Sequence, residues 1–157
     1  MDTRINSVPV FLIRLLVGWI FFVEGILKFL WWSDLGVGRF AAIGIPTPGI
    51  MAPFVGIVEI VCGALILVGL FTRLVACPLL IDISVAILST KIPIWLNRPY
   101  WRFALPQLKH YGFLSMLHEA RTDFSTVLGL IFLLVTGGGT LSVDAFRKPA
   151  PNSRGLS

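Results

Sequence analysis

Three charged residues, Arg14, Glu59 and Asp82, lie within long apolar stretches of the sequence. Glu59 is the only acidic or basic side chain in residues 51–70, and a charge there is costly unless another group pairs with it. A carboxyl group can donate or accept a proton, and a guanidinium can stabilise negative charge. The three residues therefore predict a proton-handling catalytic site inside an apolar region. We expect Glu59 and Arg14 to be central to this site and Asp82 to support them.

Three further charged residues, Lys28, Arg73 and Asp123, lie near the ends of the apolar stretches. We expect them to line the rim of the site, where they would bind a cofactor. For Lys28 the sequence leaves an alternative open, because Glu24 lies four residues earlier on the same helical face. In that interpretation Lys28 extends to the membrane surface and Glu24 neutralises its charge.

The elements that must position these residues are long and apolar. The chain has 157 residues, of which 56% are hydrophobic and only 13% are charged, and this composition excludes an ordinary soluble globular protein. Four apolar segments, 8–30, 51–70, 74–96 and 124–143, each have about twenty residues, enough for a helix to cross a hydrocarbon core of roughly 30 Å. The sequence therefore predicts an all-α integral membrane protein, a four-transmembrane-helix antiparallel bundle.

The bundle is predicted to form one transmembrane domain, residues 1–147, followed by a disordered basic tail at 148–157. The first apolar segment is too long for the core of a signal peptide, so we expect it to be retained. Residues 97–122 connect the third and fourth segments, and basic residues alternate there with aromatic ones. Such a pattern can bind single-stranded nucleic acid. Between two spans it instead favours an interfacial segment on the lipid bilayer, and nucleic acid is not an expected partner.

Glu59 and Asp82 are predicted to lie at similar depths. Counting residues from the turn at 71–73 places them within about 5 Å of each other along the membrane normal. If both face inward, the bundle holds two carboxyl groups that need a cation between them to ionise together. Arg14 and, less well placed, Arg73 are the expected cations. The alternative is a set of interhelical salt bridges whose only role is packing.

The sequence offers few residues of the kind that hold a redox cofactor. Its two histidines, His110 and His118, both lie in the 97–122 connection, so neither is placed to ligate a membrane-embedded haem. The two cysteines, Cys62 and Cys77, form no iron–sulfur motif, and no glycine-rich fingerprint for a flavin or nicotinamide is present. We therefore expect no metal and no covalently bound cofactor.

Several of these residues stand in a pattern that resembles the DoxX family of small bacterial four-helix membrane proteins. The matching positions are Arg14, Gly18, Glu24, Gly25 and Lys28, then Gly44-Ile45-Pro46, then Glu59, Gly63, Leu65, Gly69, Thr72 and Arg73, with Asp123-Phe124 at the start of the fourth segment. The family name is tied to terminal quinol oxidase and thiosulfate:quinone oxidoreductase subunits. The resemblance therefore implies the four-helix fold and a bacterial inner-membrane subunit associated with quinone-linked oxidoreduction.

Three functions fit these observations. The first is a quinone-linked oxidoreductase subunit, in which a redox partner protein or the quinone itself carries the electrons. The second is a non-catalytic membrane scaffold or assembly partner. The third is a transporter of protons or a small molecule, which would need a homo-oligomer because four helices enclose little space. The basic residues divide evenly between the two sides of the predicted bundle, so the positive-inside rule does not fix its orientation. We expect both termini in the cytoplasm.

Overall fold

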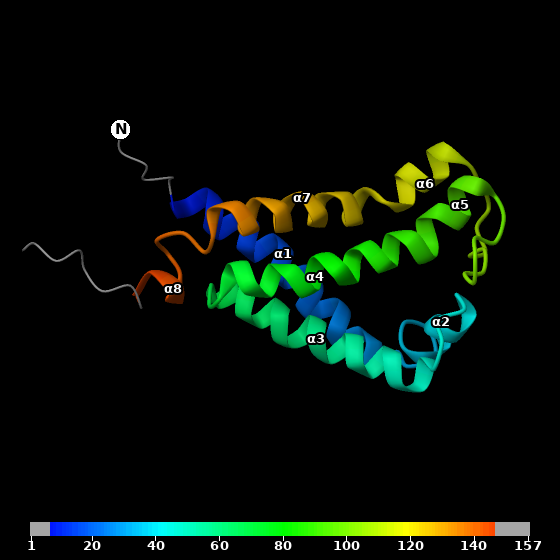
Figure 1. The fold of residues 1–157 in the computed structure, drawn as a ribbon, viewed down its shortest axis with the longest axis horizontal. Coiled ribbons are helices and arrows are strands. Elements are labelled where there is room, and N and C mark those ends of the chain that lie inside the picture. Colours follow the sequence, from blue (N-terminus) through cyan, green and yellow to red (C-terminus); the bar gives the residue numbers. More distant parts are fainter. Residues whose placement is uncertain (1–6, 147–157) are drawn as a thin grey trace, which may run out of the picture.

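The structure, a computed structural model, describes residues 7–146 (Figure 1). Its regular elements within this range are all helical, and the only β-type pairing there is an isolated bridge between Tyr100 and Phe103. In chain order the elements are α1 (Ser7–Leu30), α2 (Val37–Ala42), α3 (Pro48–Val68), α4 (Thr72–Ala86), the π-helical segment η1 (Ile87–Lys91), α5 (Ile92–Leu96), α6 (Phe113–Glu119), α7 (Arg121–Thr136) and α8 (Val143–Phe146).

The prediction of an all-α fold is confirmed for the described part of the chain. Three helices are long and apolar enough to cross a membrane: Val8–Leu30, Pro48–Val68 and Thr72–Leu96. The last of these is the continuous run of α4, η1 and α5. The fourth predicted span, 124–143, overlaps α7, but α7 has 16 residues and ends at Thr136. A crossing usually takes about 17–25 residues, so the four-span bundle stays a prediction.

The long helices lie beside one another and define two ends of the molecule. Helix α1 contacts α3 and α7, and α4 contacts the same two helices. The start of α1, the α3–α4 turn and α8 lie together at one end, which we call the α8 end (Figure 1). Helices α2, α5 and α6 lie at the opposite end, the α2–α6 end.

Glycines allow the backbones of α1 and α3 to approach each other closely. A Cβ atom added to Gly63 would lie 2.7 Å from the backbone nitrogen of Phe22 and 2.9 Å from the carbonyl oxygen of Gly18. Two turns along α1, a Cβ atom on Gly25 would lie 2.7 Å from the carbonyl oxygen of Gly56. Small residues at such contacts are the usual means of close helix packing in membranes. They also fix the register between α1 and α3.

An apolar cluster fills much of the bundle interior. Its buried members come from α1, α3, α4 and α7 and are Val10, Val17, Phe21, Ile66, Val75, Ala76, Leu79, Ile83, Leu130 and Leu133. Most of these positions belong to the halves of their helices nearer the α8 end. Charged and hydroxyl side chains gather in the other half, where they form the site described below.

The π-helical segment η1 has an identifiable cause. Pro93 follows it directly and has no backbone N–H, and in a regular α-helix its ring would crowd the carbonyl of Ser89. The wider turn over Ile87–Lys91 avoids this clash. It also buries two hydroxyl side chains, Ser89 and Thr90, which both donate hydrogen bonds to the carbonyl oxygen of Ala86, at 3.2 and 2.6 Å. Single π turns inside helices frequently occur at functional sites.

The connection between α5 and α7 covers the α2–α6 end. The backbone N–H of Ala104 donates to the carbonyl of Ile43 at 3.1 Å, and that of Gly112 donates to the carbonyl of Ile94 at 3.0 Å. These bonds hold residues 97–112 against the ends of α2 and α5. The position of this connection at one end of the bundle agrees with the predicted interfacial segment. The predicted tail at 148–157 lies outside the described residues.

Candidate functional site

A buried ion pair between α1 and α3 forms the centre of the candidate site. Lys28 Nζ lies 2.6 Å from Glu59 Oε2 and 2.8 Å from Glu59 Oε1. The two side chains are only 12% and 6% exposed. Gly25 and Gly56 lie one helical turn before Lys28 and Glu59, respectively. The close backbone contact at these glycines therefore brings the two charged side chains within reach of each other.

Asp82 on α4 is the third ionisable group of this centre. Its carboxyl group interacts with that of Glu59 and with the Lys28 ammonium. Two acids and one base from three different helices thus converge inside the bundle. The predicted grouping of Glu59 with Asp82 agrees with this arrangement, and the cation that joins them is Lys28.

The three groups line a cavity of about 470 Å³. Such a volume lies in the range of small-molecule sites, roughly 300–1,000 Å³. Apolar side chains form much of the wall, including Ile20, Phe21, Phe40, Val55 and Ile83. The charged side chains of the wall are Glu24, Lys28, Arg39, Glu59, Asp82, Lys91, Glu119 and Asp123. The cavity can therefore hold an apolar ring system and present both hydrogen-bond donors and acceptors to polar substituents.

A second ion pair lines the same cavity. Lys91 Nζ lies 3.1 Å from Asp123 Oδ2, and the side chains are 12% and 17% exposed. Lys91 is the last residue of η1, and Asp123 lies in the first turn of α7. The predicted rim residue Asp123 thus belongs to the site, and its partner Lys91 was not anticipated. The polar run Ser89-Thr90-Lys91 within an apolar segment was the sequence signal for this part of the wall.

The prediction that Arg14 pairs with Glu59 was wrong, because Arg14 lies towards the α8 end. Its guanidinium donates to four carbonyl oxygens, those of Ile66 at 2.9 Å, Leu67 at 2.5 Å, Gly138 at 3.1 Å and Leu141 at 2.6 Å. The α1–α3 register explains the difference. Gly18 faces Gly63 and Gly25 faces Gly56, so Glu59 is level with α1 about eight residues beyond Arg14, roughly 12 Å away along the axis. Lys28 is nearer to that level and has a long side chain.

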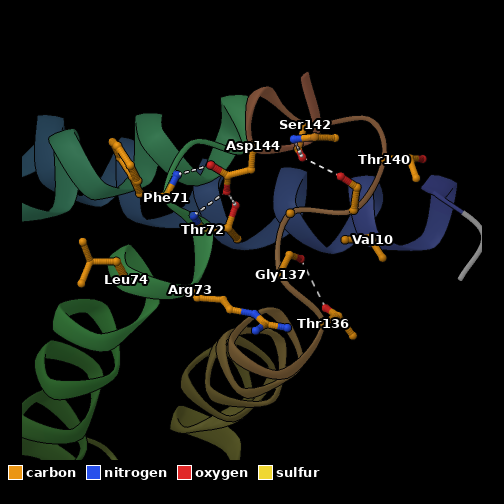
Figure 2. Close-up of a pocket in the computed structure, with 13 residues that line it drawn as sticks. Val10, Phe71, Thr72, Arg73, Leu74, Thr136, Gly137, Thr140, Ser142 and Asp144 are labelled. Carbon is orange, nitrogen blue, oxygen red and sulfur yellow. Dashed lines mark hydrogen bonds between the residues drawn. The ribbon is translucent and has the colours of Figure 1, made fainter. Parts of the chain in front are cut away.

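Arg73, the other predicted cation, also lies at the α8 end. It lines a separate cavity of about 710 Å³, shown in Figure 2. Its guanidinium donates to the carbonyl oxygen of Val135 at 2.7 Å. The predicted set of six site residues therefore divides between two places. Lys28, Glu59, Asp82 and Asp123 share one cavity, whereas Arg14 and Arg73 hold the chain together at the opposite end.

The α8 end is closed by the segment that follows α7. Asp144 accepts hydrogen bonds from the backbone N–H groups of Phe71 at 2.8 Å and Thr72 at 3.0 Å, and from the Thr72 hydroxyl at 3.1 Å (Figure 2). A carboxylate at this position satisfies N–H groups at the start of α4 and complements the helix dipole. Together with the Arg14 bonds to Gly138 and Leu141, this contact ties residues 137–146 to α1, α3 and α4.

The Lys28–Glu59 pair makes an asymmetric prediction about stability. Lys28→Met should lower the free energy of unfolding by about 3 kcal/mol or more, because it leaves the buried Glu59 and the half-buried Asp82 without their cation. Glu59→Gln should cost less, because Asp82 still faces Lys28. The double variant should be more stable than the sum of the two effects predicts. Unfolding in mixed detergent micelles measures this coupling. Combining Lys28→Met with Arg73→Lys, at the opposite end of the molecule, is the control and should give additive effects.

Comparisons with known proteins agree on one family. The family model for DoxX matches residues 10–92, just over half of the chain. A Mycobacterium tuberculosis protein named "Uncharacterized membrane protein Rv3486" is 51% identical over 134 residues, which cover 84% of this chain and 77% of that protein. A Bacillus subtilis protein named "Putative oxidoreductase CatD" is 29% identical over 135 residues, which cover 86% of this chain and 84% of that protein. No solved structure matches the chain with significant similarity.

Proposed function

Because the chain belongs to the DoxX family of membrane proteins, we propose that it is a membrane-embedded subunit of a quinone-linked oxidoreductase. The Lys28–Glu59–Asp82 centre would bind the quinone headgroup and handle its protons. The observation that carries this proposal is the convergence of these groups in a cavity of about 470 Å³ with a largely apolar wall. The oxidoreductase name of the Bacillus relative supports it further.

The residues of the cavity fit a quinone headgroup. A quinone carries two carbonyl oxygens on an apolar ring and takes up two electrons and two protons when it becomes a quinol. The Lys28 ammonium can donate a hydrogen bond to a carbonyl oxygen, and Phe21, Phe40 and Val55 offer apolar surface to the ring. A carboxyl group held at the same place can give or accept a proton. The electrons would come from the cofactor of a redox partner protein.

We place the protein in the bacterial inner membrane as a four-span protein, with α7 as the fourth span and both termini in the cytoplasm. The outward face of α7 supports the crossing. Phe124, Leu128, Ile131 and Val135 follow each other at helical spacing and are 63%, 52%, 46% and 70% exposed. Such an apolar stripe suits contact with lipid. Helix α7 would span about 24 Å at 1.5 Å per residue, so the bilayer thins locally or the flanking residues complete the crossing.

Copurified quinone tests the proposal directly. The protein is purified in mild detergent, and quinone is extracted and identified by absorbance and mass spectrometry. We expect close to one quinone per chain in the wild type and a loss of at least tenfold in Glu59→Gln. Asp34→Asn, which neutralises an exposed acid outside the cavity, is the matched control and should retain the quinone.

Two results would contradict the proposal. Quinone retained in a folded Glu59→Gln variant would show that the quinone headgroup does not bind at this centre. Titration of the purified protein with a short-chain quinone detects ligand that is lost during purification. If neither the copurified nor the added quinone binds the wild type, the proposal fails, and a scaffold that acts through a protein partner becomes the better account of the fold.

A further inference from the structure

We infer that the Lys28–Glu59–Asp82 centre is open to water from the α2–α6 end only, through a second cavity whose junction with the first is formed by Arg39, Lys91 and Glu119. The role of this route in supplying protons rests on the proposed function. The route itself follows from the arrangement of the two cavities and the burial of the side chains between them.

The second cavity adjoins the site and lies at the α2–α6 end. It has a volume of about 660 Å³ and is lined by residues of α2, α5 and the connection that follows α5. Five residues line both cavities, namely Arg39, Ile43, Thr90, Lys91 and Glu119. One layer of side chains therefore separates the two spaces, and most of that layer is polar.

Burial increases step by step from this junction to the centre. Arg39 and Glu119 are exposed. Behind them the side chains of Lys91 and Asp123 are 12% and 17% exposed and form the second ion pair. Ser89 and Glu59 are buried further inside. Polar groups thus continue from the protein surface to the middle of the bundle.

One face of the continuous run of α4, η1 and α5 completes this path of polar groups. Asp82, Ala86, Ser89 and Thr90 all line the site cavity, and Lys91 follows at its outer margin. The hydroxyl groups of Ser89 and Thr90 each donate to Ala86, which leaves their oxygen lone pairs able to accept hydrogen bonds. Water in the cavity can therefore be hydrogen-bonded next to the Lys91–Asp123 pair by these hydroxyl groups and, further inside, by Asp82.

The opposite direction offers no such path among the described residues. The apolar cluster that includes Val17, Ile66, Leu79 and Leu130 fills the bundle between the centre and the α8 end. The cavity at that end (Figure 2) shares no lining residue with the site cavity. Arg14 lies at the level of this cluster, between Val10 and Val17 of α1, and its N–H groups donate to backbone carbonyl oxygens. In this conformation the site can therefore exchange protons with one side of the membrane.

Thiol labelling of the full-length protein in liposomes tests the route. Cys62 and Cys77 are first replaced by alanine, and single cysteines are then introduced as Ser89→Cys in the site and Thr140→Cys in the α8-end cavity. A charged, membrane-impermeant thiol reagent is added from outside or enclosed inside. We expect Ser89→Cys to be modified from one side and Thr140→Cys from the opposite side. Val17→Cys, in the apolar cluster, should be modified at least a hundredfold more slowly from either side.

A further variant tests the junction itself. Glu119→Trp, which places a bulky side chain between the two cavities, should slow the modification of Ser89→Cys at least tenfold and leave that of Thr140→Cys unchanged. If Ser89→Cys does not fold, Thr126→Cys takes its place, because Thr126 is buried and lines the site cavity but not the second cavity.

The inference is overturned if the site cysteine reacts from the side on which Thr140→Cys reacts, from both sides, or from neither. These outcomes do not depend on quinone. One-sided labelling in a protein that binds no quinone would leave the route in place and remove the proposed function. Quinone binding with two-sided labelling would support the proposed function and contradict the one-sided route.

Discussion

Replacing Gly63 with alanine should unfold or severely destabilise the protein, although alanine is normally the better helix former by about 1 kcal/mol. The new Cβ atom would lie 2.7 Å from the backbone nitrogen and 3.0 Å from the Cα atom of Phe22. Both are backbone atoms, which cannot move aside as the end of a side chain can. Helices α1 and α3 would have to separate, and the Lys28–Glu59 pair one to two turns away would be pulled apart with them. Overpacking of this kind costs about 1–3 kcal/mol and occasionally more.

Gly49→Ala is the matched control for this prediction. Gly49 lies in the first turn of the same helix, and a Cβ atom added there meets nothing within 4 Å. This variant should be as stable as the wild type or slightly more stable. The measurement is the fraction of monodisperse protein after detergent extraction, together with the unfolding midpoint. Equal stability of the two variants would show that α1 and α3 are not in the close contact described here.

Arg14→Lys should also destabilise the protein strongly, by about 3 kcal/mol or more, even though the charge is kept. The guanidinium donates to four carbonyl oxygens in two directions, towards α3 and towards the segment after α7. A lysine ammonium is a single point that cannot reach all four. Each buried carbonyl left without a donor costs about 1–3 kcal/mol. We expect the loss of stability to be accompanied by faster proteolysis after Thr136.

Arg73→Lys provides the comparison, because within residues 7–146 the Arg73 side chain donates one hydrogen bond, to Val135, and that contact is exposed. It should change the unfolding midpoint little. Quinone binding adds a second readout. A folded fraction of Arg14→Lys should still bind quinone at the Lys28–Glu59–Asp82 centre, since Arg14 lies roughly 12 Å from the level of Glu59. Loss of quinone affinity in the folded Arg14→Lys protein would instead show that Arg14 belongs to the quinone site.

The three long helical runs, Val8–Leu30, Pro48–Val68 and Thr72–Leu96, could be predicted from the sequence because each one is long and apolar, a property of composition alone. The turn between the second and third segments was predicted at 71–73. In the structure α3 ends at Val68, where Gly69 adopts a positive φ of 72°, and α4 begins at Thr72, so the turn lies about two residues earlier. Asp82 and Glu59 could be grouped because the short turn between α3 and α4 fixes their relative depth. For these residues local sequence was sufficient.

The partner of Glu59 could not be predicted in the same way. A long loop and the short helix α2 separate α1 from α3, so residue counting does not fix their register. That register comes from which glycines meet, Gly18 with Gly63 and Gly25 with Gly56. Arg14 looked like a partner for Glu59 because both are charges in apolar segments. Its true acceptors are backbone carbonyl oxygens, which carry no signal in the sequence.

The contacts of residues 137–146 bear on how the chain is completed during synthesis. Arg14 is made early, yet two of its four acceptors, Gly138 and Leu141, are made more than a hundred residues later. The start of α4 likewise waits for Asp144. Until these residues leave the ribosome, a buried guanidinium and a helix start lack part of their hydrogen bonding. A chain that stops before Gly138 therefore retains all of α1, α3 and α4 but exposes this defect, which would distinguish unfinished copies from finished ones for membrane proteases.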